Sequence, residues 1–241
     1  MPKFPSSVDA NEIFRFAKMA GKWWDPTGEY AMLHRMNPTR LRFIRQCYGT
    51  GPTPFKNLNM LDIGCGGGFL SEPLARLGAN VVGIDATREN IDVAQVHAQQ
   101  SGISNIEYLH STAEDLQIEQ AGKFDAVCAL EILEHVVDPK SFVQTCVSQC
   151  RPGGLLFFST INRTFISQLL TIQFAENIAG WVPKGTHTFE KYVTPAELKQ
   201  YVTEAGCSLI DTTGMLYNPI LREWTLGKSL EMNYIVACIK K

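Results

Sequence analysis

Positive charge is not in excess in this chain. Its 241 residues include 22 Lys and Arg against 24 Asp and Glu, which gives a formal net charge of −2. Binding to the phosphate backbone of a nucleic acid depends on an excess of Lys and Arg. The composition therefore argues against a general nucleic-acid binder, and we expect no nucleic-acid partner.

Paired cysteines and long apolar runs are also lacking. The seven cysteines are odd in number and none belongs to a C-x-x-C pair, so we expect free thiols in a reducing compartment. No run approaches the roughly 20 apolar residues of a membrane-spanning helix. The first residues, Met1–Pro5, match neither a signal peptide nor a transit sequence.

Apolar residues nevertheless make up 45% of the chain, which suits one α/β domain with a modest insertion. Glycine and proline separate predicted strands from predicted helices along most of the length. This alternation predicts a doubly wound, mostly parallel sheet with right-handed crossovers. The predicted strands are 59–63, 80–85, 105–110, 123–130 and 155–159, followed by 207–213 and 233–240 as an antiparallel hairpin.

The stretch Met60–Leu70 is the most informative part of the sequence. A short apolar strand runs into a glycine-rich turn, Gly64–Gly68, which opens a helix. Such a turn brings backbone N–H groups and the positive end of the helix to the polar groups of a ligand. A dinucleotide-binding turn would read G-x-G-x-x-G, and that register puts Phe69 where the third glycine belongs.

The pattern present is instead D-x-G-x-G-x-G, formed by Asp62, Gly64, Gly66 and Gly68. Asp85 ends the next strand, where an acid can accept both hydrogens of a ribose diol. Together these residues resemble the signature of the class I S-adenosylmethionine-dependent methyltransferases. The resemblance implies a Rossmann-like sheet and S-adenosylmethionine as the cofactor.

The third predicted strand is followed directly by the segment Ser111–Leu116. In methyltransferases of this class an acid at this strand end contacts the adenine amino group, which makes Glu114 or Asp115 a candidate for this contact. We take Ala113, which precedes them, as a further candidate cofactor residue. A helix N-cap whose acids complement the helix dipole is an alternative reading of the same segment.

Glu131, Glu134 and His135 follow the fourth predicted strand, at the edge where ligands of α/β sheets bind. If this segment is helical, the three positions share one face. Two carboxylates and an imidazole on one face can hold a divalent cation or supply a general base for a hydroxyl. An acidic turn with a capping histidine is the alternative. We take His135 and Glu134 as candidate catalytic residues and all three as candidate metal ligands.

The N-terminal region offers two further groups of candidates. Residues 9–24 predict a helix that ends with Trp23 and Trp24. These tryptophans either pack in a core or lid, or line an apolar substrate pocket. A basic helix follows from His34 to about Tyr48. Its cations either form a solvated face or meet a carboxylate of the cofactor.

Residues 163–190 interrupt the α/β pattern. The segment Phe165–Phe174 is strongly apolar, and Ile178, Trp181 and Val182 extend it. An amphipathic helix here could lie in a membrane interface, or it could be a lid that packs on its own domain.

Several sequence blocks together resemble the ubiquinone-biosynthesis O-methyltransferase family, from about residue 12 to the C-terminus. The glycine turn is common to many methyltransferases. The W-W-D, H-R-x-N-P, P-K-G-T-H and L-Y-N-P blocks are specific, and they occur in the family's order. The matching blocks are Lys22–Asp25, Leu33–Pro38, Leu61–Gly68, Glu131–His135, Ser159–Arg163, Pro183–His187 and Gly214–Pro219.

This resemblance implies O-methylation of a polyprenylated catechol in ubiquinone synthesis. It implies ligation of a divalent cation, magnesium or alternatively zinc, by Glu131, Glu134 and His135. It also favours contact of residues 163–182 with a membrane surface. The cofactor roles that it implies fall on Arg40, Gly64, Asp85 and Leu130, and the candidate substrate contacts are Trp23, Trp24, His187 and Tyr217.

Eukaryotic members of the family act in mitochondria, peripheral on the matrix side of the inner membrane and within a multiprotein complex. Bacterial members act in the cytoplasm, peripheral on the inner membrane. We predict the mitochondrial location with the bacterial one as the alternative, and other ubiquinone-biosynthesis proteins as partners.

We expect a helical cap, residues 1–50, over the cofactor site of a methyltransferase domain, residues 51–241, that carries the insertion 163–190. A class I O-methyltransferase of another small catechol and a catalytically silent lipid-binding subunit are the competing functions. The intact glycine turn, Asp85 and Glu131–His135 argue against the silent subunit. The lack of an N/D-P-P-Y/F block after the fourth strand argues against a nucleic-acid methyltransferase.

Overall fold

The computed structural model describes residues 7–49, 51–168 and 189–241. Its strands are β1 (Asn59–Ile63), β2 (Asn80–Asp85), β3 (Ile106–His110), β4 (Phe124–Leu130), β5 (Cys150–Ile161), β6 (Cys207–Asn218), β7 (Glu223–Gly227) and β8 (Asn233–Lys240). Its α-helices are α1 (Ala10–Met19), α2 (Ala31–Gln46), α3 (Ser71–Arg76), α4 (Arg88–Gln100), α5 (Ala113–Gln120), α6 (Pro139–Gln149), α7 (Phe165–Gln168) and α8 (Pro195–Glu204). Short 3-10 helices are η1 (Ala20–Lys22), η2 (Leu133–His135) and η4 (Phe189–Lys191).

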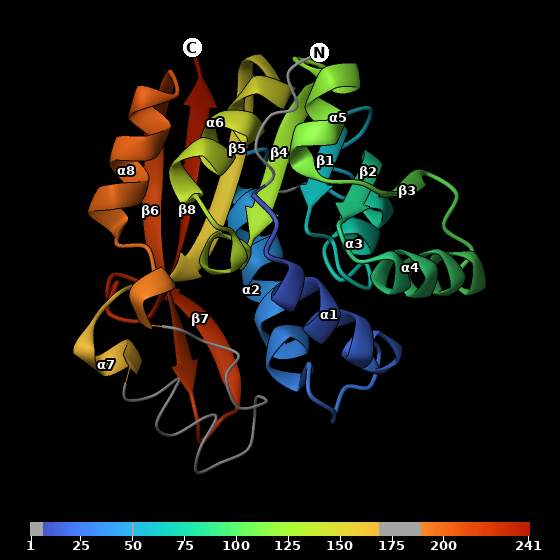
Figure 1. The fold of residues 1–241 in the computed structure, drawn as a ribbon, viewed down its shortest axis with the longest axis horizontal. Helices are drawn as coiled ribbons and strands as arrows, with labels where there is room; N and C mark the ends of the chain where they lie inside the picture. The colour runs from blue at the N-terminus through green and yellow to red at the C-terminus, as the bar shows by residue number, and fades with distance from the viewer. Residues whose placement is uncertain (1–6, 50, 169–188) are drawn as a thin grey trace.

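The strands form one sheet in the order β3-β2-β1-β4-β5-β8-β6-β7 (Figure 1). β1 to β5 are parallel, whereas β8 runs antiparallel to both β5 and β6, and β7 runs antiparallel to β6. The direction in which strands are added reverses between β1 and β4. Open α/β sheets bind ligands at such a switch point, outside the carboxyl ends of the strands.

Successive side chains of the central strands pack into two different cores. Leu61 and Ile63 join the cluster that α5, α6 and α8 cover, whereas Met60 joins the cluster that α2 and α3 cover. Figure 1 shows these helices on opposite faces of the sheet. A strand buried on both faces must be apolar at almost every position, which is why β4 reads as a continuous apolar run.

Local signals fix several helix ends. Thr194 and Glu197 form a reciprocal capping box at the start of α8. Asp138 caps α6, whose first residue is Pro139, a position where a missing N–H has no cost. These caps set where the chain leaves the sheet edge and re-enters a helix.

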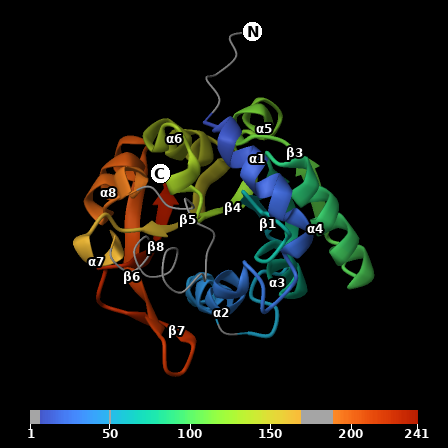
Figure 2. The same cartoon turned by 60° about the horizontal axis from the view of Figure 1, so that its bottom comes forward.

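The N-terminal segment lies across the carboxyl ends of the parallel strands. Figure 2, which looks toward those ends, shows α1 passing in front of β1 and β4, between α4 and α5. Val8 forms an isolated antiparallel bridge with Val136, and the Val137 N–H donates to the Ser7 carbonyl at 2.9 Å. The chain start is thereby attached to the segment that carries His135.

The predicted doubly wound fold is confirmed, but the C-terminal region is more extensive than predicted. β6 continues to Asn218 and pairs with β7, which the sequence pattern did not indicate. β7 has only five residues, of which Trp224 alone is buried, so its sequence carries little strand signal. The predicted antiparallel pairing of 207–213 with 233–240 is present as β6 and β8. β8 also pairs with β5 on its other side, because it lies between β5 and β6.

The predicted apolar insertion is described only in part. Residues 165–168 form α7, and residues 169–188 lie outside the described residues. Within the ranges that the structure describes, no helix combines the length and the apolar character needed to cross a bilayer.

Replacing Gly67 with Ala tests how closely the N-terminal segment sits on the glycine turn. A Cβ at Gly67 would lie 2.6 Å from the Cβ of Trp23, so Trp23 has to move. We expect a loss of roughly 1–3 kcal/mol in the free energy of unfolding, measured by thermal or urea denaturation. Gly21→Ala is the matched control, because a Cβ there meets nothing within 4 Å. Equal stability of the two variants would contradict this packing.

Candidate active site

A cavity of about 1310 Å³ opens at the carboxyl ends of β1 and β4, at the switch point of the sheet. The glycine turn after β1, the end of β2, the segment after β4, α2 and the C-terminal strands all contribute to its lining. Residues far apart in the sequence therefore meet around one space. Its size and its position are those of a ligand site.

The glycine turn has the backbone conformation that its sequence requires. Gly64 and Gly66 have φ angles of 70° and 53°, in the left-handed region that other residues enter at a cost. The Gly64 and Cys65 N–H groups both donate to the Ile84 carbonyl, at 2.8 and 2.9 Å. These bonds fasten the turn to the end of β2.

Asp85 connects the turn to the N-terminal segment. Its buried carboxylate accepts hydrogen bonds from the N–H groups of Gly66 (2.9 Å) and Thr87 (2.8 Å) and from the Asn90 side chain (3.2 Å). Burial raises the pKa of Asp85, and these donors oppose the rise. Asn90 in turn accepts from the Trp23 indole N–H at 2.8 Å. A carboxylate has about four lone-pair directions, and three are in use, so acceptor capacity remains for one hydroxyl of a ligand in the cavity.

Asp62 lies beneath the turn and is fully enclosed. The Ser71 hydroxyl donates to its Oδ2 at 2.6 Å, which joins the end of β1 to the start of α3. Burial raises the pKa of Asp62 to about 7, against the lowering effects of Ser71 and Arg40. Asp62 therefore stabilises the shape of the turn and takes up a proton near neutral pH.

Arg40 presents a buried guanidinium to the cavity. It is 5% exposed, and its Nη2 lies 3.4 Å from Glu131 Oε1. Its Nε and Nη2 have no hydrogen-bond acceptor among the described residues. Buried donors without acceptors carry a desolvation cost, and a ligand carboxylate would relieve that cost with a bidentate contact. Arg40 thus fits the predicted contact with the carboxylate of S-adenosylmethionine.

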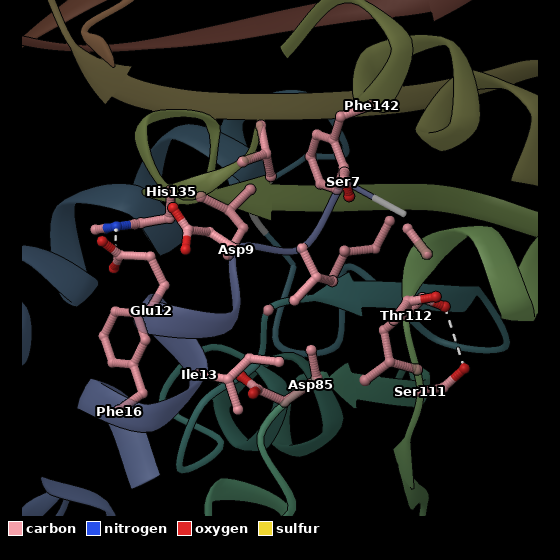
Figure 3. A pocket seen from close by; sticks show the side chains of 18 residues that line it. Ser7, Asp9, Glu12, Ile13, Phe16, Asp85, Ser111, Thr112, His135 and Phe142 are labelled. Carbon is pink, nitrogen blue, oxygen red and sulfur yellow. Dashed lines mark hydrogen bonds and ion pairs between the residues drawn. The ribbon is translucent and has the colours of Figure 1, made fainter. Parts of the chain in front are cut away.

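A smaller cavity of about 80 Å³ adjoins the first and shares Gly64, Asp85 and His135 with it. Figure 3 shows it closed by Ile13 and Phe16 of α1 on one side and by Ser111 and Thr112 on the other. Ala113 lines this space as well. Glu114 does not: its side chain is buried at the start of α5, and among the described residues its Oε2 has no hydrogen-bond partner. A mostly apolar pocket beside Asp85 suits a flat heterocyclic ring such as adenine.

Glu131, Glu134 and His135 all line the large cavity, but each is held by a different group. Glu131 accepts from the Ser159 hydroxyl at 2.6 Å and from the Asn233 amide at 3.0 Å. Glu134 accepts from the Thr160 hydroxyl at 2.7 Å, and burial together with Glu131 raises its pKa. His135 Nδ1 lies 3.0 Å from Glu12 Oε2 of α1, an interaction drawn in Figure 3.

The expected single helix face is absent from this segment. Glu131 has φ 54°, which no helix contains, and the following 3-10 turn spans only Leu133–His135. Within residues 7–49, 51–168 and 189–241, no three His, Cys, Asp or Glu side chains are grouped so that they could hold a metal ion. In this arrangement the three predicted ligands do not fit a common cation, because their oxygen and nitrogen atoms point to separate partners.

The candidate substrate residues separate into three groups. Trp23 is buried at 7% exposure and lines the large cavity, as does Tyr217. Trp24 is not among the lining residues: its indole N–H donates to the Gly67 carbonyl at 3.0 Å, and its ring stacks on His97 with centroids 3.4 Å apart. Trp24 therefore holds the glycine turn from outside the cavity. His187 lies outside the described residues.

Sequence reasoning missed Tyr30. Its ring stacks on Trp23 with centroids 3.8 Å apart, and Tyr30 is one of the residues that line the cavity. Its hydroxyl is buried and has no hydrogen-bond partner among the described residues. Burial and the nearby Asp85 raise its pKa, so it stays protonated as a donor. Tyr30 comes from a turn between two helices, and no spacing rule marks such a position. Glu12 was missed for a different reason: its partner His135 is 123 positions away in the sequence.

The comparisons with known proteins agree with this geometry. The family model described as a methyltransferase domain matches residues 29–212. A protein named ubiquinone biosynthesis O-methyltransferase from Sinorhizobium fredii (strain NBRC 101917 / NGR234) is 46% identical over 238 residues, which cover 96% of this chain and 95% of that protein. A protein of the same name from Methylobacterium nodulans is 47% identical over 238 residues, again 96% of this chain and 95% of the relative.

Solved structures share the fold at much lower identity. Magnesium protoporphyrin IX methyltransferase from Synechocystis PCC 6803 aligns with a TM-score of 0.69 at 19% identity, over 97% of this chain and all of that one. An S-adenosylmethionine-dependent methyltransferase from Aquifex aeolicus aligns with a TM-score of 0.62 at 16% identity, over 91% of this chain and 97% of that one. The predicted class I methyltransferase fold is therefore confirmed.

The raised pKa of Asp62 predicts a pH dependence of stability. The folded state binds this proton with a pKa of about 7 against 3.8 for an ordinary Asp. The stabilising contribution is complete below 3.8 and is lost as the pH rises through about 7. Asp62→Asn removes this loss. The Tm of the variant minus the Tm of wild type should therefore increase by roughly 2–6 °C between about pH 5 and pH 8.

Asp125→Asn is the control for that experiment. Burial raises the pKa of Asp125, but hydrogen bonds from Arg151 and the Asn59 N–H outweigh burial and lower it below 3.8. Its contribution is lost only as the pH falls below that value, so the Tm difference between Asp125→Asn and wild type should stay constant over the same range. A constant difference for Asp62→Asn would contradict the raised pKa.

Tyr30→Phe tests whether the Tyr30 hydroxyl contacts the cofactor. We expect a loss of roughly 3–10-fold in affinity for S-adenosylhomocysteine, measured by calorimetry, because one hydrogen bond to the ligand is removed. Tyr48→Phe is the matched control: its hydroxyl also lacks a partner, but its ring packs on Phe55 and Phe157, away from the cavity. Equal affinities of both variants and wild type would exclude Tyr30 from the site.

Proposed function

Because the chain belongs to the ubiquinone biosynthesis O-methyltransferase family, we propose that its large cavity binds S-adenosylmethionine beside a polyprenylated catechol and methylates a catechol hydroxyl. The protein is an S-adenosylmethionine-dependent O-methyltransferase of ubiquinone biosynthesis. The observation that carries the substrate proposal is the meeting of Arg40, Asp85 and His135 around one cavity, whose remaining lining is largely apolar.

In the proposed complex the cofactor spans both cavities. Arg40 holds its carboxylate, and Asp85 accepts a ribose hydroxyl. The N–H groups of Gly64, Gly66 and Gly68 are already bonded to Ile84, Asp85 and Cys65, so the glycine turn contributes its shape and the close approach of its backbone. Ala113 and Leu130 make apolar contacts, and Glu114 supports the adenine end from within α5. When bound, S-adenosylmethionine supplies a methyl group on a positively charged sulfur.

The chain's own residues have to align the acceptor hydroxyl and remove its proton. His135 is the first candidate for the base, since Glu12 fixes its ring through Nδ1 at 3.0 Å. Glu134 is the second, since burial and Glu131 keep its pKa raised toward the range in which it exchanges a proton. Met215, Trp224 and Ile166 offer apolar surface along which a prenyl tail can lie.

A divalent cation, magnesium or zinc, is a separate part of the proposal that rests on family resemblance. To bind it, Glu131, Glu134 and His135 would have to exchange Asn233, Thr160 and Glu12 for a shared ligand. No catalytic step above depends on that exchange.

We also propose a location at a membrane surface, with contact through about residues 163–182, where Phe165 is 76% exposed at the start of α7. The mitochondrial inner membrane, with the bacterial inner membrane as the alternative, and association with other ubiquinone-biosynthesis proteins stay predictions. The same holds for the division into a cap, 1–50, and a methyltransferase domain, 51–241.

The test is turnover of S-adenosylmethionine on a short-chain prenylated catechol. We expect activity in wild type and a loss of roughly 10²–10⁴-fold in kcat for His135→Gln, with the affinity for S-adenosylhomocysteine retained. His110→Gln is the matched control, because His110 is exposed and lines neither cavity. Cofactor binding without turnover of any catechol would favour a silent subunit, and equal turnover of catechols that lack a prenyl chain would favour a soluble-substrate enzyme.

The same assay distinguishes the two roles of the acidic segment. Activity that is lost in chelator and restored by magnesium or zinc would support a cation at Glu131, Glu134 and His135. Full activity in chelator would leave His135 or Glu134 as the base without a metal.

A further inference from the structure

The tip of the β6–β7 hairpin exposes two large aliphatic side chains in succession. Ile220 is 89% exposed, the highest value among the exposed large hydrophobic side chains of the described residues, and Leu221 is 64% exposed. Neither belongs to a core cluster or lines a cavity described above. Figure 2 shows the hairpin projecting from the body of the molecule. Two such neighbours at a projecting point are unusual on a surface that only meets water.

The backbone of the tip is already hydrogen bonded. The Asn218 side-chain oxygen accepts from the N–H groups of Ile220 and Leu221, at 2.9 and 3.1 Å. Asn218 itself pairs with Glu223 at the end of the β6–β7 ladder, and Arg222 closes the turn with φ 54°. An unpaired N–H is costly to move out of water, and here that cost is avoided for the two apolar residues. The tip is therefore an apolar point at which the N–H groups of Ile220 and Leu221 both have an acceptor.

The residues beside the tip belong to the large cavity. Pro219 and Arg222 flank the two aliphatic side chains, and both line that cavity. Ile166 of α7 lines it too and is 40% exposed, next to the more exposed Phe165. The apolar points of the hairpin and of α7 thus both adjoin the opening of one cavity.

We propose that Ile220 and Leu221 insert into the surface of a lipid bilayer and hold the opening of the large cavity against it. Two side chains are too few for a protein partner, because one side of a stable protein interface buries roughly 800 Å². A fluid apolar phase accepts a narrow point without a complementary shape. The inference extends the proposed membrane contact to a segment outside residues 163–182. It rests on the proposed function in one respect, because a polyprenylated substrate is the reason for the enzyme to meet a membrane.

The charges of the tip predict the kind of binding. Arg222 can meet a lipid phosphate, but the adjacent Glu223 is exposed and carries the opposite charge. Insertion should therefore depend on apolar contact more than on anionic lipid. Binding should be similar for neutral vesicles and for vesicles with some anionic lipid, and it should persist at high salt.

The test is co-sedimentation of the full chain with phosphatidylcholine vesicles, with and without phosphatidylglycerol. We expect wild type to bind. The double variant Ile220→Ser with Leu221→Ser should bind at least roughly tenfold more weakly than wild type. The matched control is Val96→Ser with Ile210→Ser. These two side chains are 53% and 52% exposed, on α4 and near the start of β6, away from the hairpin tip. The control variant should bind as wild type does.

A second measurement separates this inference from the proposed function. Turnover of a short-chain catechol in solution should be equal in wild type and both double variants, since none of the four residues lines a cavity. Loss of vesicle binding with turnover retained supports the inference. The inference would be overturned if wild type failed to bind vesicles or if both double variants were weakened equally. Absence of turnover in wild type would count against the proposed function alone.

Discussion

The buried carboxylate of Asp85 is the contact on which the rest of the site depends. Its donors come from the glycine turn, from the start of α4 and, through Asn90, from Trp23 of the N-terminal segment. A buried carboxylate without such donors would be neutral or destabilising. The turn, the end of β2 and the N-terminal segment therefore keep one relative arrangement, and each of them stabilises an acid that lines the large cavity.

The N-terminal segment acts at two points of the cavity at once. Trp23 covers the glycine turn, and Glu12 of α1 holds the His135 ring at the wall of both cavities. The bridge between Val8 and Val136 fixes the same chain start beside His135. A movement of α1 that opened the small cavity would thus also release the His135 ring. The closure of the small cavity and the orientation of the imidazole are consequences of the same packing.

Sequence reasoning succeeded where the determinants are local. The positive φ angles at Gly64 and Gly66 follow from glycine itself, and the central strands were readable because burial on both faces leaves a continuous apolar run. It was wrong about the shared helix face of Glu131, Glu134 and His135, because their side chains are set by partners on β5, β8 and α1. Tyr30 was missed because its role arises from stacking on Trp23 across a turn. Contacts of this range leave no periodic trace in a single sequence.

The charge distribution of the cavity explains which ligand it suits. Asp62, Asp85 and Glu134 are buried acids whose pKa burial raises, and the buried Arg40 guanidinium opposes this rise at Asp62 and Glu134. Because burial favours the protonated forms of these acids, the cavity carries less negative charge than three ordinary carboxylates would. In the proposed complex the carboxylate of the ligand lies on Arg40 and its positive sulfur lies near these acids, where it would favour their ionised forms. Such a ligand lowers the electrostatic cost of burying these carboxylates, so its binding and the stability of the folded site support each other.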